Sequence, residues 1–182
     1  MESAIESAPE LARTKHAAGH LFDESRSPMF DHISEVATLV KEQGGTDAMI
    51  AAAWLHDVVE DTDVTLEQVG EWFGSAVCEL VDGLTDPDEF ASMPLELRKR
   101  AQAERIRHLS DGVKRIKLCD QLSNARRVLD KPPVDWAEDL QWTQIEGARA
   151  ITLECRGLWP ALDERFDAVY AAARLRFLGT SS

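Results

Sequence analysis

The residues best suited to chemistry lie in one short segment that follows an apolar run. His56 and Asp57 are adjacent, and Glu60 and Asp61 come three and four residues after Asp57, on one helical face directly after residues 50–55. Three acids crowded against an apolar segment raise one another's pKa unless a cation balances them. A metal ion would supply that balance, so the segment predicts a metal site.

Two residues elsewhere in the chain are candidates to complete such a site. His32 leads the apolar positions of a predicted helix, and Asp120 interrupts the apolar stretch 116–122, where a carboxylate needs a partner. Two imidazoles and two carboxylates without a thiolate favour Mn²⁺, Fe²⁺ or another octahedral ion over structural zinc. Such a metal activates water for attack on phosphorus, and Glu60 or Asp61 could orient or deprotonate that water.

The elements that must position these residues are predicted to be helices. Apolar residues recur at helical spacing through nearly the whole chain, and no stretch of four or more residues alternates as a strand does. Thr65 and Gln68 have the spacing of a capping box. Helices are expected around residues 33–40, 49–55, 66–73, 77–81, 113–129, 142–158 and 161–177, with a basic one starting near residue 94. The expected fold is all-α, a single bundle of about eight to ten helices.

The composition bounds the size and location of the protein. The 182 residues, 44% apolar and 29% charged, suit one domain spanning the chain, with a core at about residues 11–177 and loose ends of about eight residues at the N-terminus and four at the C-terminus. No apolar run is long enough for a bilayer, and residues 1–10 do not resemble a secretory signal, so a cytoplasmic location is expected. Cys78, Cys119 and Cys155 are predicted to be buried, reduced thiols.

The charge of the chain is unevenly distributed. Its formal net charge of −13 argues against a nucleic acid as partner, because Lys and Arg must neutralise the phosphates of such a ligand. Residues 98–131 nevertheless contain 11 basic and 4 acidic side chains, a local charge of +7. A local positive wall on an acidic protein suits a small polyanion.

Several blocks of sequence, spread over residues 11–170, match one family pattern. They include residues 30–33 (FDHI), 52–62 (AAWLHDVVEDT), 80–85 (LVDGLT), 98–100 (RKR) and 117–126 (KLCDQLSNAR). In these blocks the chain resembles the HD-domain hydrolases, and more closely the hydrolase half of RelA/SpoT enzymes and the single-domain small alarmone hydrolases of the metazoan SpoT-homologue type.

The resemblance implies a Mn²⁺-dependent hydrolase that removes the 3′-pyrophosphate of ppGpp and pppGpp and yields GDP or GTP and pyrophosphate. It assigns the metal to His32, His56, Asp57 and Asp120, and the positioning and activation of water to Glu60 and Asp61. It assigns substrate contacts to Lys15 and Asn124, although a hydrogen-bond pair of Asn124 with Asp120 on one helical face is the alternative. Arg98, Lys99 and Arg100 are expected to face the polyphosphate, with a solvated helical face as the alternative. It implies a small guanosine polyphosphate as substrate, and neither a nucleic acid nor a membrane as partner.

The chain departs from the family pattern on the substrate side. Residues 26–33 read RSPMFDHI where many relatives have Gly-x-Pro-Tyr-Ile-x-His-Pro, Asp23 replaces an arginine that helps to bind substrate in several relatives, and Gln121 replaces a common arginine. Two alternatives therefore stay open. One is a phosphatase of another nucleotide, such as a 5′-nucleotidase or an NADPH 2′-phosphatase. The other is a non-catalytic domain that binds an alarmone or a partner protein.

The three remaining histidines are expected to lie outside the metal site. His16 and His20 belong to the first helix and are assigned structural or rim roles, and His108 is expected on the surface of a basic stretch.

Overall fold

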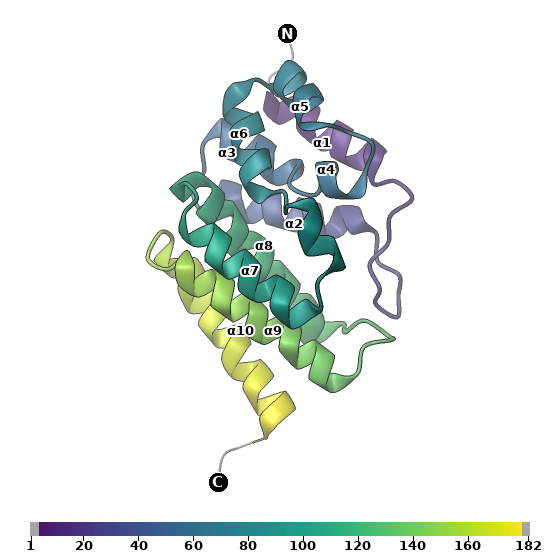
Figure 1. The fold of residues 1–182 in the computed structure, drawn as a ribbon, viewed down its shortest axis with the longest axis vertical. Coiled ribbons are helices and arrows are strands. Elements are labelled where there is room, and N and C mark those ends of the chain that lie inside the picture. The colour runs from purple at the N-terminus through teal and green to yellow at the C-terminus, as the bar shows by residue number, and fades with distance from the viewer. Residues whose placement is uncertain (1–3, 180–182) are drawn as a thin grey trace.

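The computed structural model describes residues 4–179, and every regular element among them is a helix (Figure 1). The α-helices are α1 (Ala4–Lys15), α2 (Met29–Glu42), α3 (Asp47–Trp54), α4 (Val58–Asp61), α5 (Leu66–Phe73), α6 (Ser75–Leu84), α7 (Leu95–Arg107), α8 (Asp111–Asp130), α9 (Glu138–Glu154) and α10 (Pro160–Leu178). A 3₁₀ helix, η1 (Asp88–Ser92), lies between α6 and α7. The predicted all-α fold is confirmed.

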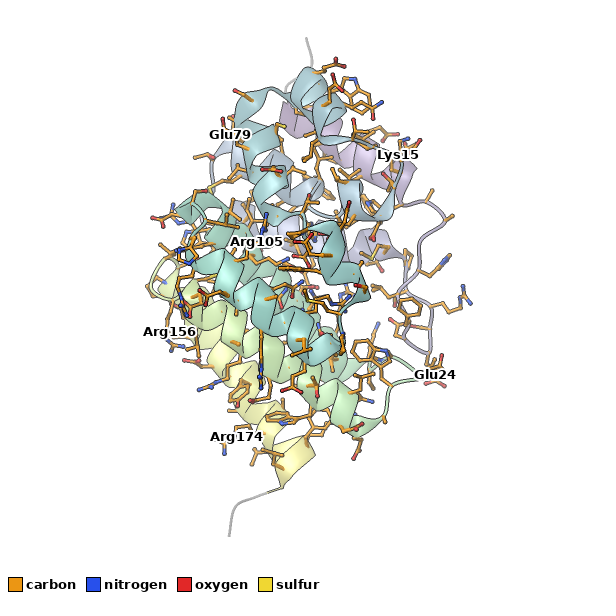
Figure 2. The ribbon with its side chains drawn as sticks, in the orientation of Figure 1. Lys15, Glu24, Glu79, Arg105, Arg156 and Arg174 are labelled. Atoms are coloured by element: carbon orange, nitrogen blue, oxygen red, sulfur yellow. The ribbon has the colours of Figure 1, made fainter. Side chains whose placement is uncertain are left out.

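The long helices and the short helices occupy different halves of the molecule. Figure 1 shows α7, α8, α9 and α10 as long rods in one half, while α1 and α3 to α6 gather in the other. Helix α8 contacts α2, α3 and α6 as well as α9 and α10, so it joins the two halves. Arg105 of α7 adds a second link, because it donates to the carbonyls of Asp82 and Gly83 in α6 (Figure 2).

Local sequence signals explain several helix boundaries. Thr65 and Gln68 form the predicted capping box, in which each side chain accepts the backbone N–H of the other residue. Other boundaries differ from the prediction. Helix α1 begins at Ala4 and buries Ala8, so residues 4–8 are not a loose end, and α9 begins at Glu138 rather than near Trp142. Residues 1–3 and 180–182 lie outside the described part of the chain.

One main hydrophobic core and a smaller second cluster hold the helices together. The second cluster contains Val128, Ile145 and Ala173 from α8, α9 and α10, with aromatic residues of the C-terminal half packed against it. All three cysteines are free thiols; Cys119 and Cys155 are buried and Cys78 is partly buried. In the described part of the chain, no helix combines the length and apolar character that crossing a membrane requires. The cytoplasmic location stays a prediction.

A glycine sets the approach of α7 to α9. A Cβ atom at Gly147 would lie 2.6 Å from the Cβ of Lys99, a collision with a side chain that has no room to move away. The stem of Lys99 therefore crosses α9 where no side chain projects, and its Nζ donates to Oε1 of Gln121 on α8 at 3.3 Å. This packing leaves Lys99 only 7% exposed and directs its ammonium group into the bundle.

Candidate metal centre and active site

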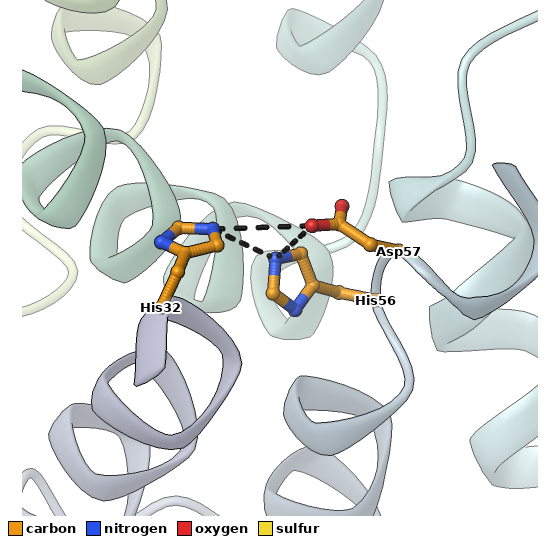
Figure 3. A group of neighbouring side chains, drawn as sticks. All are labelled: His32, His56 and Asp57. Atoms are coloured by element: carbon orange, nitrogen blue, oxygen red, sulfur yellow. Dashed lines mark hydrogen bonds and ion pairs between the residues drawn. The ribbon is translucent and has the colours of Figure 1, made fainter. Parts of the chain in front are cut away.

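Four side chains from three parts of the fold converge beside α8. His32 comes from the first turn of α2, His56 and Asp57 from the turn between α3 and α4, and Asp120 from the middle of α8. The Nε2 atoms of the two histidines are 3.3 Å apart, and Oδ2 of Asp57 lies 3.2 Å from Nε2 of His56 and 3.9 Å from Nε2 of His32 (Figure 3). Oδ1 of Asp120 lies 3.4 Å from Nε2 of His32. We call these four residues the metal-site cluster.

The other ring nitrogen of each histidine is already engaged. Nδ1 of His56 lies 2.8 Å from the carbonyl oxygen of Ala53, which can only accept, so Nδ1 carries the hydrogen in the neutral ring. Nδ1 of His32 lies 2.9 Å from Oγ of Ser123. The Nε2 lone pair of neutral His56 therefore points toward Nε2 of His32 and the carboxylate of Asp57. This donor set fits a divalent cation that takes nitrogen and oxygen ligands.

The charges of the cluster also call for a cation. Burial would lower the pKa of His56, but Asp57 and Asp120 outweigh it and raise the pKa to about 9. Burial would likewise raise the pKa of Asp120, but Lys117, His32 and His56 hold it well below its ordinary value. Without a metal, a proton on His56 thus supplies positive charge to a pocket in which both histidines and Asp120 are buried.

Three neighbours on α8 fix the carboxylate of Asp120. Asn124 Nδ2 donates to Oδ1 at 2.6 Å, Gln121 Nε2 donates to Oδ2 at 2.8 Å, and Lys117 Nζ lies 3.0 Å from Oδ2. The resemblance implies that Asn124 contacts the nucleotide, and the structure forms the alternative, its hydrogen-bond pair with Asp120. The sequence predicts no role in the site for Lys117 or Gln121. The spacing of Lys117 and Asp120, three residues apart on one helix, is a signal that could have identified the ion pair.

Glu60 and Asp61 lie at the solvent-exposed edge of the cluster, on α4. Partial desolvation raises the pKa of Glu60 to about 7, and desolvation together with the charge of Asp57 raises the pKa of Asp61 to about 6. Oε1 of Glu60 accepts the backbone N–H of Asp86 at 2.7 Å, and Gln102 of α7 donates to the carboxylate of Asp86. Both acids can therefore exchange protons near neutral pH.

The predicted substrate contacts differ in their burial and in their partners. Lys15 Nζ lies 2.5 Å from Oδ1 of Asp63, and Figure 2 shows this lysine at the α1 end of the molecule. Consecutive helical residues point about 100° apart. Accordingly, Lys99 turns into the bundle, Arg98 is partly buried, and exposed Arg100 pairs with Glu96 one turn earlier at 2.6 Å. Contact of these residues with a substrate stays a prediction.

His16 and Asp23 have surroundings that the sequence did not indicate. His16 is buried, its Nε2 has no hydrogen-bond partner, and it interacts electrostatically with Asp57, His56 and His32. It therefore lies beside the metal-site cluster. Asp23, at the position of the substrate-binding arginine, is buried and accepts hydrogen bonds from Ser27 N at 2.9 Å and Ser25 Oγ at 3.0 Å, so it shapes its own loop.

The other two histidines are exposed. Nδ1 of His20 lies 3.0 Å from the carbonyl oxygen of Ala18, and His108 lies 3.5 Å from Glu104 on α7. The predicted surface position of His108 is confirmed.

The fold and the cluster together define a class of protein. A helical bundle that places an adjacent His-Asp pair against a second histidine and a distant aspartate has the architecture of a metal-dependent HD domain. The chain matches the HD domain family over residues 8–167 and belongs to that family. The family predicted from the sequence is therefore confirmed.

Similar proteins cover nearly the whole chain. The guanosine-3′,5′-bis(diphosphate) 3′-pyrophosphohydrolase MESH1 of Mus musculus is 34% identical over 165 residues, 90% of each chain, and MESH1 of Homo sapiens is 35% identical over 159 residues, 86% of this chain and 87% of its own. A solved structure of a metazoan orthologue of SpoT, described as hydrolysing ppGpp and acting in starvation responses, superposes with a TM-score of 0.86 at 29% identity, covering 94% of this chain and 96% of its own.

A more distant structure shares the fold. The Listeria monocytogenes protein lmo0812 gives a TM-score of 0.62 at 26% identity, covering 81% of this chain and 99% of its own.

Proposed function

We propose that this chain is a metal-dependent phosphohydrolase that removes the 3′-pyrophosphate of ppGpp and pppGpp, giving GDP or GTP and pyrophosphate. The observation that carries the proposal is the convergence of the four cluster residues, with two acids of raised pKa at their edge, in a chain that is 34% identical over 90% of its length to a relative named for this reaction. We further propose that the chain forms one hydrolase domain, with a helical core that begins at Ala4 and not near residue 11.

The metal would be held by His32, His56, Asp57 and Asp120. Mn²⁺ is the preferred candidate, because two imidazoles and two carboxylates suit an octahedral ion of intermediate hardness. When bound, such an ion acts as a Lewis acid that activates water and stabilises the charge that develops on a phosphoryl group. Lys117 and Asn124 keep the Asp120 carboxylate ionised and oriented toward the histidines.

Glu60 is the proposed proton acceptor for the attacking water. With a pKa of about 7, a substantial fraction of its carboxylate is ionised at neutral pH and its conjugate acid can return the proton to a leaving group. The N–H of Asp86 engages Oε1, which leaves Oε2 available to the water. Asp61, the next residue of the short helix α4, would orient the same water.

Substrate contacts are proposed for Lys15, Asn124, Arg98, Lys99 and Arg100, as the resemblance implies. Lys99 and Asn124 are linked to the Asp120 carboxylate by hydrogen bonds, through Gln121 and directly. Lys15 and Arg100 would have to leave their acidic partners, Asp63 and Glu96, to reach a phosphate. Lys99 and Asn124 therefore have the stronger support as substrate contacts.

A second candidate keeps the metal-site cluster and changes the substrate. The observation in its favour is Asp23, which shapes its own loop where relatives have a substrate-binding arginine. A nucleotide 5′-phosphatase or an NADPH 2′-phosphatase would release orthophosphate, whereas the proposed reaction releases pyrophosphate. A non-catalytic alarmone-binding or partner-binding domain would release neither.

The decisive experiment incubates the purified protein with Mn²⁺ and ppGpp and separates the products by anion-exchange chromatography. We expect GDP and pyrophosphate in equal amounts, with turnover reduced at least about 100-fold in His56→Ala and Glu60→Ala. Parallel incubations with NADPH and with GMP test the second candidate. Equal turnover of ppGpp by the wild type and both variants, with metal shown to be bound, would overturn the proposal.

A further inference from the structure

A chain of hydrogen bonds leads from His32 away from the metal-site cluster to the outer surface of α2 and α8. Nδ1 of His32 lies 2.9 Å from Oγ of Ser123, and Oγ of Ser123 lies 2.7 Å from Oε2 of Glu35. Ser123 has no exposed surface and His32 is 3% exposed, whereas Glu35 is partly buried. Glu35 follows His32 by one turn of α2, so both residues face α8.

The direction of each hydrogen bond follows from what each group can donate. A glutamate at neutral pH accepts only, so the single hydroxyl hydrogen of Ser123 goes to Glu35. Oγ of Ser123 must then accept from Nδ1–H of His32, and it also accepts from Nε–H of Arg127 at 3.4 Å. With Nδ1 carrying the hydrogen, the lone pair of His32 is on Nε2 and faces the metal-site cluster.

Two arginines of α8 hold the outer end of this chain. Nη1 of Arg126 lies 3.1 Å from Oε1 of Glu35, and Nη2 of Arg127 lies 3.5 Å from Oε2. Two cations against one carboxylate keep Glu35 in place and leave Oε2 to accept from Ser123. His56 has no comparable chain, because its Nδ1 is held by the backbone carbonyl of Ala53.

We propose that Ser123 and Glu35 are positioning residues that hold His32 in the Nδ1–H tautomer and aim its Nε2 at the metal. This inference rests on the proposed metal centre. Outer residues that orient a metal-bound histidine commonly contribute 10- to 100-fold to metal affinity. The same relay explains why a serine is buried three residues after Asp120 on the face of α8 that meets α2.

The test is Mn²⁺ binding to purified variants, measured by the electron paramagnetic resonance signal of free Mn²⁺. We expect Ser123→Ala to weaken Mn²⁺ binding about 10- to 100-fold, and Ser123→Thr, which keeps the hydroxyl, to stay within about threefold of the wild type. Because Glu35 acts through Ser123, the double variant Ser123→Ala/Glu35→Gln should bind no more weakly than Ser123→Ala. Thr38→Ala, which removes an exposed hydroxyl from α2, is the matched control and should leave Mn²⁺ binding unchanged.

The variant His32→Ala separates failure of the relay from failure of the metal centre. If His32→Ala binds Mn²⁺ as the wild type does, the proposed metal centre is wrong. If His32→Ala weakens binding but Ser123→Ala and Glu35→Gln do not, the centre stands and the relay is wrong. Glu35→Gln alters only a partly buried side chain, so it carries the test if Ser123→Ala fails to fold. At saturating Mn²⁺, the KM for ppGpp should change less than about twofold in either relay variant. A general loss of structure would instead change both the Mn²⁺ affinity and the KM for ppGpp.

Discussion

The metal-site cluster and the basic run Arg98–Arg100 are both prominent in the sequence, but the side chains of the cluster converge in the fold and those of the basic run point apart. The cluster gathers four residues that are up to 88 positions apart, His32 to Asp120, and each has a defined hydrogen-bond or ionic partner. The basic run keeps three neighbours adjacent along the chain but sends their side chains into different surroundings.

The difference arises from burial. A polar group removed from water costs free energy unless it finds a partner, so the buried residues of the cluster must converge on one another or on a cation. An exposed cation remains hydrated and gains little from any single partner. Burial thus makes the residues of the metal-site cluster converge, whereas an exposed side chain such as Arg100 pairs with whichever charged neighbour is near.

The largest effect is expected from removing the proposed base without disturbing the metal-site cluster. Glu60→Gln keeps the volume and the contact with the N–H of Asp86 but cannot accept a proton, so kcat should fall about 10²- to 10⁴-fold. Mn²⁺ affinity should stay within about threefold, because Glu60 lies at the edge of the cluster. Steady-state kinetics and Mn²⁺ titration measure the two effects. An unchanged kcat would assign proton transfer to another group, with Asp61→Asn the next variant to measure.

Lys117→Met tests whether burial makes the partners of the cluster indispensable. The substitution leaves the buried carboxylate of Asp120 without its lysine partner, and losing one partner of a buried ion pair typically costs about 3 kcal/mol or more. Urea denaturation of the metal-free protein should show this loss in the free energy of unfolding. Lys114→Met, one turn earlier on α8, is the control, because Lys114 is likewise partly buried but does not pair with Asp120, and it should change stability by less than about 0.5 kcal/mol. Equal effects of the two substitutions would contradict the comparison.

Lys99 is the one member of the basic run that is buried, so the effect of replacing it on the free energy of unfolding should depend on pH. Burial, followed by the charge of Lys117, lowers its pKa to about 8, below the value of about 10.4 expected in the unfolded chain. Between these two values the unfolded state binds more protons than the folded state, so the free energy of unfolding of the wild type rises with pH. The stability of Lys99→Met relative to the wild type should therefore fall by about 2 kcal/mol between pH 7 and pH 10. Urea denaturation at several pH values measures the trend, and a difference independent of pH would refute it.

The smallest effect is expected at Arg100. Its side chain is exposed and pairs with Glu96 at the (i, i+4) positions of α7, an interaction worth less than about 0.5 kcal/mol. Arg100→Ala should change the free energy of unfolding by no more than that amount, and thermal unfolding provides the measurement. A larger loss of stability would mean that the ion pair with Glu96 contributes more than an exposed pair is expected to contribute.

The sequence predicts those features that depend on local spacing or on burial. The capping box of Thr65 and Gln68 is local, and it forms as expected. The convergence of His32, His56, Asp57 and Asp120 is not local, yet it could be anticipated, because ionisable residues set within apolar runs must face a common partner. Their role as metal ligands stays a prediction until a metal is measured.

Other features depend on the register between helices, which periodicity does not specify. The relay from His32 through Ser123 to Glu35 requires a particular rotation of α2 against α8, and none of its outer residues is unusual in the sequence. The surroundings of the basic run also follow from helix geometry, since neighbouring residues of a helix point about 100° apart. Helix α1 begins at Ala4 and buries Ala8 in the main core, a contact that the polar composition of the first residues does not reveal.

The crossing of Lys99 over Gly147 has a consequence for how this protein can evolve. A side chain at position 147 is excluded while position 99 carries a long residue that lies against α9. A substitution at either position alone changes the separation of α7 and α9, and through Gln121 it reaches the neighbourhood of Asp120. Positions 99 and 147 are therefore expected to change together among relatives, with a larger residue at 147 accompanied by a shorter one at 99.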